Sequence, residues 1–344
     1  MSSQKKAFIT GITGQDGAWL AKHLLSLGYI VYGGFRRTSS KDPWRLKTLG
    51  IENQVKMLEF DLLDYSNIYG CIKQVQPDEF YNLAAQSFVG TSFKQPISTS
   101  MVDGMGVTYI LDILQTISPH TKFYQASTSE MFGLVQEIPQ RETTPFHPRS
   151  PYGVAKLYAH WMTVNYRESY NMFATSGILF NHESELRGPE FVTRKVTMKV
   201  ADHYRGETAP LEIGNMDAQR DWGYAKEYVE GMYKIMQAEK ADTFVLATGA
   251  TTSIRDFIEK SYKVIDRDIV WEGQGADEKG FDSKTKQLLV KVNPEFYRPA
   301  EVELLIGDPS KANNILDWKA QTNIDKLAEI MVKNDIDTGS QYRI

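Results

Sequence analysis

KAFITGITGQDG, residues 6–17, joins a short apolar strand, Lys6–Thr10, to a glycine-rich turn, Gly11–Gly17. A helical segment, Ala18–Leu27, follows and ends at Gly28, a residue type that commonly caps helix C-termini. Glycines spaced G-x-x-G-x-x-G between a strand and a helix allow a tight turn and close approach of backbone N–H groups to a pyrophosphate. The stretch therefore predicts a dinucleotide site, and the alternative is a glycine-rich turn without a ligand.

Further apolar segments alternate with helical ones along the chain. We expect strands at 29–33, 55–60, 79–83, 122–127, 173–180 and 243–247, with a helix capped by Asp64 and a long helix over about 97–116. This alternation predicts an α/β fold with a Rossmann-type, doubly wound parallel sheet. We expect a cofactor-binding domain over 1–180, to which the chain returns at about 213–250. Residues 181–212 and 251–344 are expected to form a smaller α/β substrate-binding lobe, with an exposed insertion at 274–285.

Composition narrows the class of protein. The 344 residues are 42% apolar and 24% charged, with a net charge of −4, which is typical of a soluble globular protein and does not favour nucleic acid or an acidic membrane as a partner. A single cysteine, Cys71, excludes an internal disulfide and a cysteine-based metal site. We expect no metal. The N-terminal residues lack the apolar run of a signal peptide, and no window approaches about 18 apolar residues, so a cytoplasmic location is expected.

The end of the second strand bears on the choice of cofactor. NAD-binding chains usually carry an acidic residue about 20 residues after the glycine-rich turn, where it bonds the ribose 2′-hydroxyl. This chain has Arg36-Arg37-Thr38-Ser39-Ser40 instead. Two guanidinium groups and three hydroxyls suit a 2′-phosphate, so the sequence favours NADP over NAD. The alternative is a solvated basic loop.

Four side chains with complementary chemistry lie between residues 125 and 156. Thr128 and Glu130 are two apart at the end of a predicted strand and can point the same way. Tyr152 and Lys156 are four apart at the start of a predicted helix and share one face. A nearby ammonium stabilises a phenolate, so the pair suits proton transfer. An amphipathic helix with a solvated lysine is the alternative.

Polar and aromatic clusters follow the sixth strand. FVTRK (191–195), QRDW (219–222) and FYRPAE (296–301) carry arginines, a lysine and aromatic rings. Such side chains suit a substrate with phosphates and a flat base, although each cluster alone is also typical of a surface.

With these residues in hand, the chain resembles the extended short-chain dehydrogenase/reductase family and, within it, the GDP-mannose 4,6-dehydratase family, over about residues 5–335. The resemblance is carried by GITGQDG (11–17), RRTSS (36–40), NLAAQS (82–87), ASTSEMFG (126–133), SPYGVAK (150–156), NHES (181–184), FVTRK (191–195), RDWG (220–223) and FYRPAEV (296–302). It implies a hydro-lyase that converts GDP-mannose to GDP-4-keto-6-deoxymannose with tightly bound NADP, a first step toward GDP-fucose, GDP-rhamnose or related deoxysugars. It also implies a homotetramer or homodimer, with the Arg36–Ser40 loop reaching a neighbouring subunit.

The same resemblance implies residue roles. Tyr152 takes the sugar O4 proton, Lys156 lowers the pKa of Tyr152 and holds the nicotinamide ribose, Thr128 bonds the O4 region, and Glu130 removes the C5 proton and protonates the leaving C6 hydroxyl. The implied NADP contacts are Gly11, Ile12, Thr13, Gly14, Gln15, Asp16, Gly17, Arg36, Arg37, Thr38, Ser39, Asp61, Leu62, Leu83, Ala84, Ala85, Gln86, Ser87, Ser98, Lys156, His182 and Arg187. The implied substrate contacts are Ser87, Asn181, Val192, Lys195, Arg220, Arg298 and Glu301, the last a carboxylate that can accept from guanine N1–H and N2–H.

The chain departs from the family pattern at three places. Glu185 stands where a proline is usual, Gln219 stands where a lysine is usual, and a tyrosine that some members carry opposite Ser98 is missing. The first two are expected beside the ligand, but none of the three removes a catalytic group.

Three alternatives remain open at this stage. A GDP-4-keto-6-deoxymannose reductase on the same fold needs the Tyr–Lys pair but no carboxyl base, so Glu130 argues against it. A nucleotide-sugar epimerase would use another base. A non-catalytic dinucleotide sensor is expected to lose members of the Thr–Glu–Tyr–Lys set, and this chain keeps all four.

Overall fold

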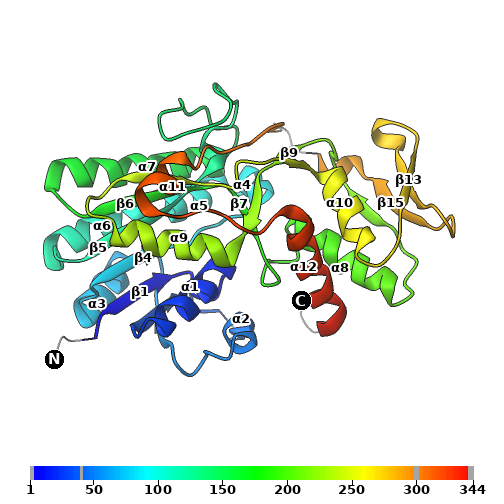
Figure 1. Ribbon diagram of the computed structural model, residues 1–344. Coiled ribbons are helices and arrows are strands. Elements are labelled where there is room, and N and C mark those ends of the chain that lie inside the picture. The colour runs from blue at the N-terminus through cyan, green and yellow to red at the C-terminus, as the bar shows by residue number, and fades with distance from the viewer. Residues whose placement is uncertain (1–3, 39–41, 298–301, 340–344) are drawn as a thin grey trace.

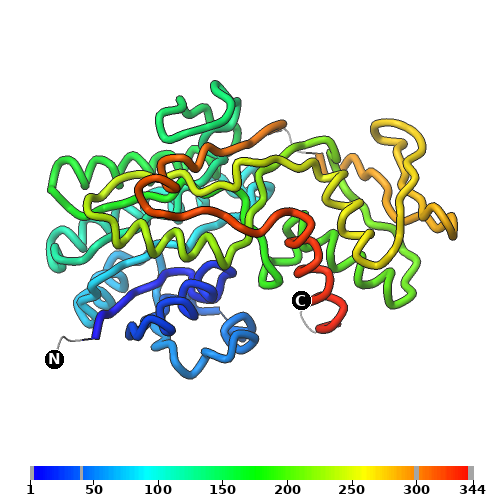
Figure 2. Tube along the Cα trace, viewed as in Figure 1, coloured from blue at the N-terminus to red at the C-terminus, as the bar shows by residue number. Residues whose placement is uncertain are grey.

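The chain forms two lobes (Figure 1), and residues of both line one cavity. The computed structural model describes residues 4–38, 42–297 and 302–339. The larger lobe contains the N-terminal half of the chain, and the smaller one contains α8, α10, α12 and a short sheet that includes β13 and β15. Figure 2 shows that the chain crosses between the lobes several times, so neither is a single continuous segment.

A seven-stranded sheet forms the centre of the larger lobe. All of its neighbouring strands pair in parallel. In spatial order the strands are β11 (Thr243–Leu246), β6 (Ala174–Leu179), β5 (Lys122–Thr128), β4 (Glu79–Asn82), β1 (Lys6–Thr10), β2 (Ile30–Phe35) and β3 (Lys56–Glu59). The direction of winding reverses between β1 and β4, the position where open parallel sheets bind ligands. The predicted doubly wound α/β fold is confirmed.

Helices cover both faces of this sheet. The alternation of side chains along β1 sends Phe8 toward one helical layer and Ala7 and Ile9 toward the other. The first layer comprises α3 (Tyr65–Val75), α6 (Gly106–Ile117) and α7 (Pro151–Tyr170). The second comprises α1 (Gln15–Ser26), α2 (Trp44–Thr48), α9 (Ala225–Gln237) and α11 (Ser310–Leu316). Asp64 caps α3 as expected, since its side chain accepts a hydrogen bond from the Asn67 N–H.

The predicted long helix over 97–116 is interrupted. The chain forms α4 (Val89–Lys94), α5 (Pro96–Ser100), a π-helical turn at Met101–Met105 and then α6. A π turn inserts an extra residue into the helical hydrogen-bond pattern, and the hydrophobic periodicity of the sequence does not reveal it.

The smaller lobe packs around a four-stranded sheet of order β13–β14–β15–β8. Its elements are α8 (Val192–Tyr204), β8 (Leu211–Ile213), α10 (Ile254–Lys263), β13 (Ile269–Glu272), β14 (Lys279–Asp282), β15 (Leu288–Val292) and α12 (Ile324–Thr338). Two small ladders, β7 (Asn181–Glu183) with β10 (Trp222–Tyr224) and β9 (Gln219–Arg220) with β12 (Thr252–Ser253), join the lobes. Within the described residues, no helix is long and apolar enough to span a membrane.

The prediction of an exposed insertion at 274–285 is wrong for residues 279–282. Residues 279–282 form β14, which pairs with both β13 and β15. Gly280 and Asp282 are buried there, and Trp271 packs over Gly280. The polar composition conceals the strand because Asp282 uses its carboxylate to cap the turn at Lys284 and Thr285.

Candidate active site

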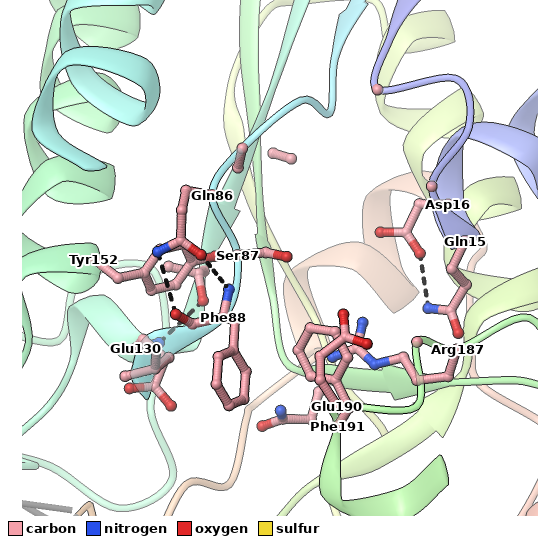
Figure 3. A pocket seen from close by; sticks show the side chains of 18 of the residues that line it. Gln15, Asp16, Gln86, Ser87, Phe88, Glu130, Tyr152, Arg187, Glu190 and Phe191 are labelled. Carbon is pink, nitrogen blue, oxygen red and sulfur yellow. Dashed lines mark hydrogen bonds between the residues drawn. The ribbon is translucent and has the colours of Figure 1, made fainter. Parts of the chain in front are cut away.

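A cavity of about 790 Å³ lies between the lobes, at the carboxyl ends of the sheet strands. Figure 3 shows Gln86, Tyr152 and Glu130 on one wall, and Gln15, Asp16 and Arg187 on the other. Ends of β1, β2, β4 and β5 and the start of α8 all contribute to its lining. The switch in strand order therefore produces a cleft with polar groups converging from both lobes.

The glycine-rich turn is shaped for close approach of a ligand. Gly11 has φ +67°, and a Cβ there would lie 2.9 Å from the Ala84 backbone. A Cβ on Gly17 would lie 2.4 Å from the Gly11 carbonyl oxygen. Gly14 is the N-cap of the 12-residue helix α1 and provides no side-chain cap, so the first-turn N–H groups remain available to an anion. These features fit the pyrophosphate of a dinucleotide.

A buried hydrogen-bond chain holds the loop after β4 against this turn. The Thr10 hydroxyl accepts the N–H groups of Leu83 and Ala84, each at 3.0 Å, and donates to Asn82 at 2.8 Å. Asn82 in turn donates to Gln125 at 2.9 Å. The loop therefore presents its backbone to the cleft in a fixed position, because its polar groups are satisfied within the protein.

The four residues singled out between 125 and 156 lie on one wall of the cleft. Glu130 is the middle residue of the short turn Ser129–Met131 after β5, and its N–H donates to the Thr128 hydroxyl at 3.2 Å. Ser150 caps α7 through the Gly153 N–H at 3.0 Å, and Tyr152 and Lys156 project from the first turns of that helix. Lys156 donates to the Ala126 carbonyl at 3.1 Å, with its Nζ 5.9 Å from the Tyr152 ring centroid. The structure thus brings a hydroxyl, a carboxyl, a phenol and an ammonium together.

The electrostatics of this wall differ from the sequence expectation. Burial raises the pKa of Tyr152, and the negative charges of Asp103 and Glu130 raise it further, while a hydrogen bond from Thr128 and the charge of Arg187 lower it. Burial also lowers the pKa of Lys156, although Asp103 and Asp16 oppose that effect. In the protein alone, desolvation thus outweighs the stabilisation of a phenolate by the nearby ammonium.

A charged pair holds the opposite wall. His182 Nδ1 lies 2.7 Å from the Phe180 carbonyl oxygen, and its Nε2 lies 2.8 Å from Asp16 Oδ2. Both neighbours are acceptors, so this arrangement favours a proton on each ring nitrogen of His182. Burial opposes these charges, but the pairing lowers the pKa of Asp16 to about 2 and raises the pKa of His182. Gln15 donates to the His182 carbonyl at 3.1 Å, which fixes the strand to α1.

The smaller lobe supplies the groups expected to hold the substrate. Arg220 is buried, and Lys195 lies 3.7 Å from the Phe296 ring centroid. The buried side-chain oxygen of Asn181 accepts no hydrogen bond from the described residues. All three line the cleft with Val192. Their charges suit a diphosphate, and the Asn181 oxygen can accept a hydrogen bond from a bound hydroxyl.

The structure places nearly all of the described candidate residues around this one cavity. Those that line it are Gly11, Thr13, Gly14, Gln15, Asp16, Gly17, Arg36, Asp61, Leu62, Leu83, Ala84, Ala85, Gln86, Ser87, Ser98, Thr128, Glu130, Tyr152, Lys156, Asn181, His182, Arg187, Val192, Lys195 and Arg220. Ile12 is buried beneath the turn, and Arg37 and Thr38 continue away from the lining. Ser39, Ser40, Arg298 and Glu301 lie outside the described residues.

The structure differs from the expectation for two positions at which the chain departs from the family pattern, Glu185 and Gln219. Neither Glu185 nor Gln219 lines the cavity. The Glu185 carboxylate accepts the Tyr224 hydroxyl at 3.3 Å, and the Gln219 side chain accepts the Thr251 hydroxyl at 3.3 Å. Their side chains are engaged with other parts of the protein, so their effect on a ligand is indirect.

Two further residues at the site carry no motif in the sequence. Arg45 donates to the Thr13 carbonyl at 2.9 Å and to the Leu186 carbonyl at 2.6 Å, so it connects the glycine-rich turn to the loop that bears Arg187. Asp103, from the π turn, is buried beside Tyr152 and Lys156. The sequence offers one signal for Asp103, an aspartate among apolar residues and glycines (MVDGMG, 101–106) in a predicted helix.

Comparisons with known proteins agree on one family. The family model described as "GDP-mannose 4,6 dehydratase" matches residues 8–331. A curated GDP-mannose 4,6-dehydratase from Sinorhizobium fredii is 48% identical over 343 residues, covering 98% of each chain. The human GDP-mannose 4,6 dehydratase is 49% identical over 339 residues, covering 96% of this chain and 91% of the human one. The solved dTDP-glucose 4,6-dehydratase of Bacillus anthracis superposes with a TM-score of 0.80 at 16% identity, over 98% of both chains, which shows the shared fold.

Proposed function

The chain belongs to the GDP-mannose 4,6-dehydratase family, and from this membership we infer that it is an NADP-dependent hydro-lyase that converts GDP-mannose to GDP-4-keto-6-deoxymannose and water. The observation that carries the mechanism is the placement of Glu130, Thr128, Tyr152 and Lys156 together on one wall of the cleft. A 4,6-dehydration needs a group for the O4 proton and a second group that can exchange protons at C5 and C6. The cleft wall offers both.

The cofactor site fits a phosphorylated dinucleotide. The uncapped start of α1 would hold the pyrophosphate, the loop over 83–87 would lie along the cofactor, and Arg36 at the end of β2 would meet the ribose phosphate. When bound, NADP⁺ supplies the acceptor for the C4 hydride and, once reduced, the donor that returns it to C6.

The residues of the wall divide the proton transfers between them. Tyr152 removes the O4 proton as C4 is oxidised, and Lys156 supports the phenolate. The resulting ketone acidifies the C5 proton, which Glu130 removes and passes to the departing C6 hydroxyl. A proton then returns to C5, and the proton that Tyr152 took from O4 balances it. Because no net oxidation occurs, the cofactor need not leave between turnovers.

The nucleotide part of the substrate is assigned to the smaller lobe. Lys195 and Arg220 bring positive charge to the cleft. Asn181 also lines it, and its buried side-chain oxygen accepts no hydrogen bond from the described residues. These groups would bind the diphosphate and a sugar hydroxyl. Arg298 and Glu301 are also expected to hold the GDP-sugar, with Glu301 accepting from the guanine, and both lie outside the described residues.

We also propose that the protein forms a homodimer or homotetramer. On α7, Val154, Tyr158 and Trp161 are 55%, 42% and 55% exposed and share one helix face. Ile97 on α5, a helix that packs on α7, is 80% exposed. In symmetric dimers, such an apolar surface is commonly buried against the same surface of a second subunit. A cytoplasmic location is proposed from the single cysteine and the reducing conditions that it suits.

Incubation of the purified protein with GDP-mannose tests this function. Mass analysis should detect a nucleotide sugar lighter than the substrate by one water, with a 4-keto group that reacts with hydroxylamine. Recovery of unchanged GDP-mannose, or of an isomer without water loss, would reject the dehydratase assignment.

A further inference from the structure

The π turn at Met101–Met105 sits behind the catalytic wall, between α5 and α6. π turns are uncommon and are frequently found at functional sites, because the extra residue redirects a side chain. The residue at the middle of this turn is Asp103, whose side chain is almost completely buried, at 1% exposure. The mechanism described above does not use this carboxyl.

Two glycines allow the π turn to approach the catalytic helix closely. A Cβ on Gly104 would lie 3.2 Å from Tyr158 and 3.6 Å from the Ala155 carbonyl oxygen, on the turn of α7 that carries Lys156. A Cβ on Gly106 would lie 2.9 Å from Leu62, a residue of the cleft lining. The backbone around Asp103 is thus held between α7 and the cofactor side of the cleft.

The Asp103 carboxylate accepts one hydrogen bond from the cofactor loop, and its negative charge affects the pKa values of two side chains on α7. Its Oδ1 accepts the Gln86 N–H at 2.7 Å, whereas its buried Oδ2 accepts no hydrogen bond from the described residues. Burial raises the pKa of Asp103 to about 6, although Lys156 and the Gln86 N–H act in the opposite direction. The negative charge of Asp103 raises the pKa of both Lys156 and Tyr152.

We propose that Asp103 is a positioning residue for the dehydration reaction: its buried carboxylate anchors the cofactor loop at Gln86 and sets a negative charge against the turn of α7 that carries Lys156. The inference rests on the proposed function, since it assigns Asp103 to the same catalytic wall. Asp103 does not line the cavity, and it acts through Lys156 and Gln86 rather than on the substrate.

The choice of residue type supports this role. An asparagine at 103 could accept the Gln86 N–H equally well and would avoid the cost of burying a charge. Lys156 offsets part of the cost of burying this carboxylate. A purely structural anchor therefore has no need of an acid here.

The proposal predicts the direction of a pH shift. Lys156 faces Asp103 and Asp16, and Tyr152 faces Asp103, Glu130, Thr128 and Arg187. Removing the charge of Asp103 lowers the pKa of both Tyr152 and Lys156. The limb of the rate profile that depends on deprotonation of Tyr152 and the limb that depends on protonation of Lys156 should both move to lower pH.

The test compares Asp103→Asn with wild type and with Asp112→Asn. Asp112 lies further along the same helical segment, in α6. Its carboxylate accepts a hydrogen bond from the Tyr65 hydroxyl at 3.0 Å, and it does not line the cleft. The kcat for GDP-mannose is measured from pH 5 to pH 10. For Asp103→Asn we expect a fall of about tenfold near pH 8 and a profile displaced to lower pH. The deficit should shrink below about pH 6, where wild-type Asp103 is protonated. Asp112→Asn should follow wild type.

A second measurement does not require turnover. Because the folded pKa of Asp103 is raised, the carboxyl favours the folded state below its unfolded pKa, and this contribution is lost as the pH rises through about 6. The Tm of Asp103→Asn minus that of wild type should therefore increase between pH 5 and pH 8. Superimposable pH–rate profiles with a constant Tm difference would overturn the role of Asp103. Failure of wild type itself to convert GDP-mannose would instead reject the proposed function.

Discussion

Replacement of Glu130 by glutamine should separate the two halves of the reaction. Glu130 is 8% exposed and lies on the cavity wall, in a turn whose backbone is fixed by the Thr128 hydroxyl and by close packing of Gly153 on the Glu130 carbonyl. A Cβ on Gly153 would lie only 2.7 Å from that carbonyl oxygen, so α7 holds the turn irrespective of the Glu130 side chain. Glutamine is nearly isosteric, and the fold should be retained.

The expected loss follows from the chemistry of the missing group. General acid–base catalysis contributes about 10²- to 10⁴-fold, or roughly 3–5 kcal/mol of barrier, so dehydration should slow by that factor. Oxidation at C4 depends on Tyr152 and should persist. Mixing the variant with GDP-mannose should therefore raise the absorbance of reduced nicotinamide, with a 4-keto hexose that keeps its 6-hydroxyl detected by mass analysis.

A matched control uses a glutamate from the same β5–α7 connection. Glu137 accepts the Thr144 hydroxyl and pairs with Arg141, away from the cavity lining. Glu137→Gln should dehydrate GDP-mannose at the wild-type rate. Near-wild-type dehydration by Glu130→Gln would remove Glu130 from the mechanism.

Four other outcomes are expected. Calorimetry should show that Arg36→Ala weakens NADP binding roughly 10- to 150-fold, the effect of losing a charge-assisted contact of about 1.5–3 kcal/mol, and leaves NAD binding unchanged; equal losses for both cofactors would contradict the assignment. GDP should inhibit competitively with GDP-mannose and UDP should not, as judged from initial rates; equal inhibition would reject the guanine preference. Asp16→Asn should cost about 2 kcal/mol in the free energy of unfolding at pH 7, because pairing lowers the pKa of Asp16 to about 2, and the difference should disappear as the pH falls from about 4 to 2; a pH-independent difference in urea unfolding would exclude this ion pair as the cause. Trp161→Glu should convert an oligomer to a monomer by light scattering, and an unchanged mass would place the interface elsewhere.

Much of the fold follows from local sequence. The central strands were predicted to within a few residues, because apolar runs bounded by glycine and polar residues specify buried parallel strands directly. Thr128 and Glu130, and Tyr152 and Lys156, were placed on common faces by the periods of strand and helix alone. The π turn at 101–105 and the strand at 279–282 were not foreseen, since both depend on packing partners distant in sequence.

The electrostatics of the site could not be obtained from spacing. The pKa of His182 is raised through Asp16, which lies 166 positions away in the sequence. The raised pKa of Tyr152 depends on burial and on Asp103, neither of which the Tyr-x-x-x-Lys pattern contains. Arg45 is likewise recruited by two carbonyl groups that the fold brings to it. These effects arise only when separate segments meet in the cleft.

The internal return of the hydride is the central claim, and GDP-mannose deuterated at C4 tests it most directly. The purified protein is incubated with this substrate without added cofactor, and the product is examined by mass spectrometry and NMR. The account predicts GDP-4-keto-6-deoxymannose with the deuterium at C6. Product without deuterium at C6, or conversion that requires stoichiometric added NADPH, would contradict it.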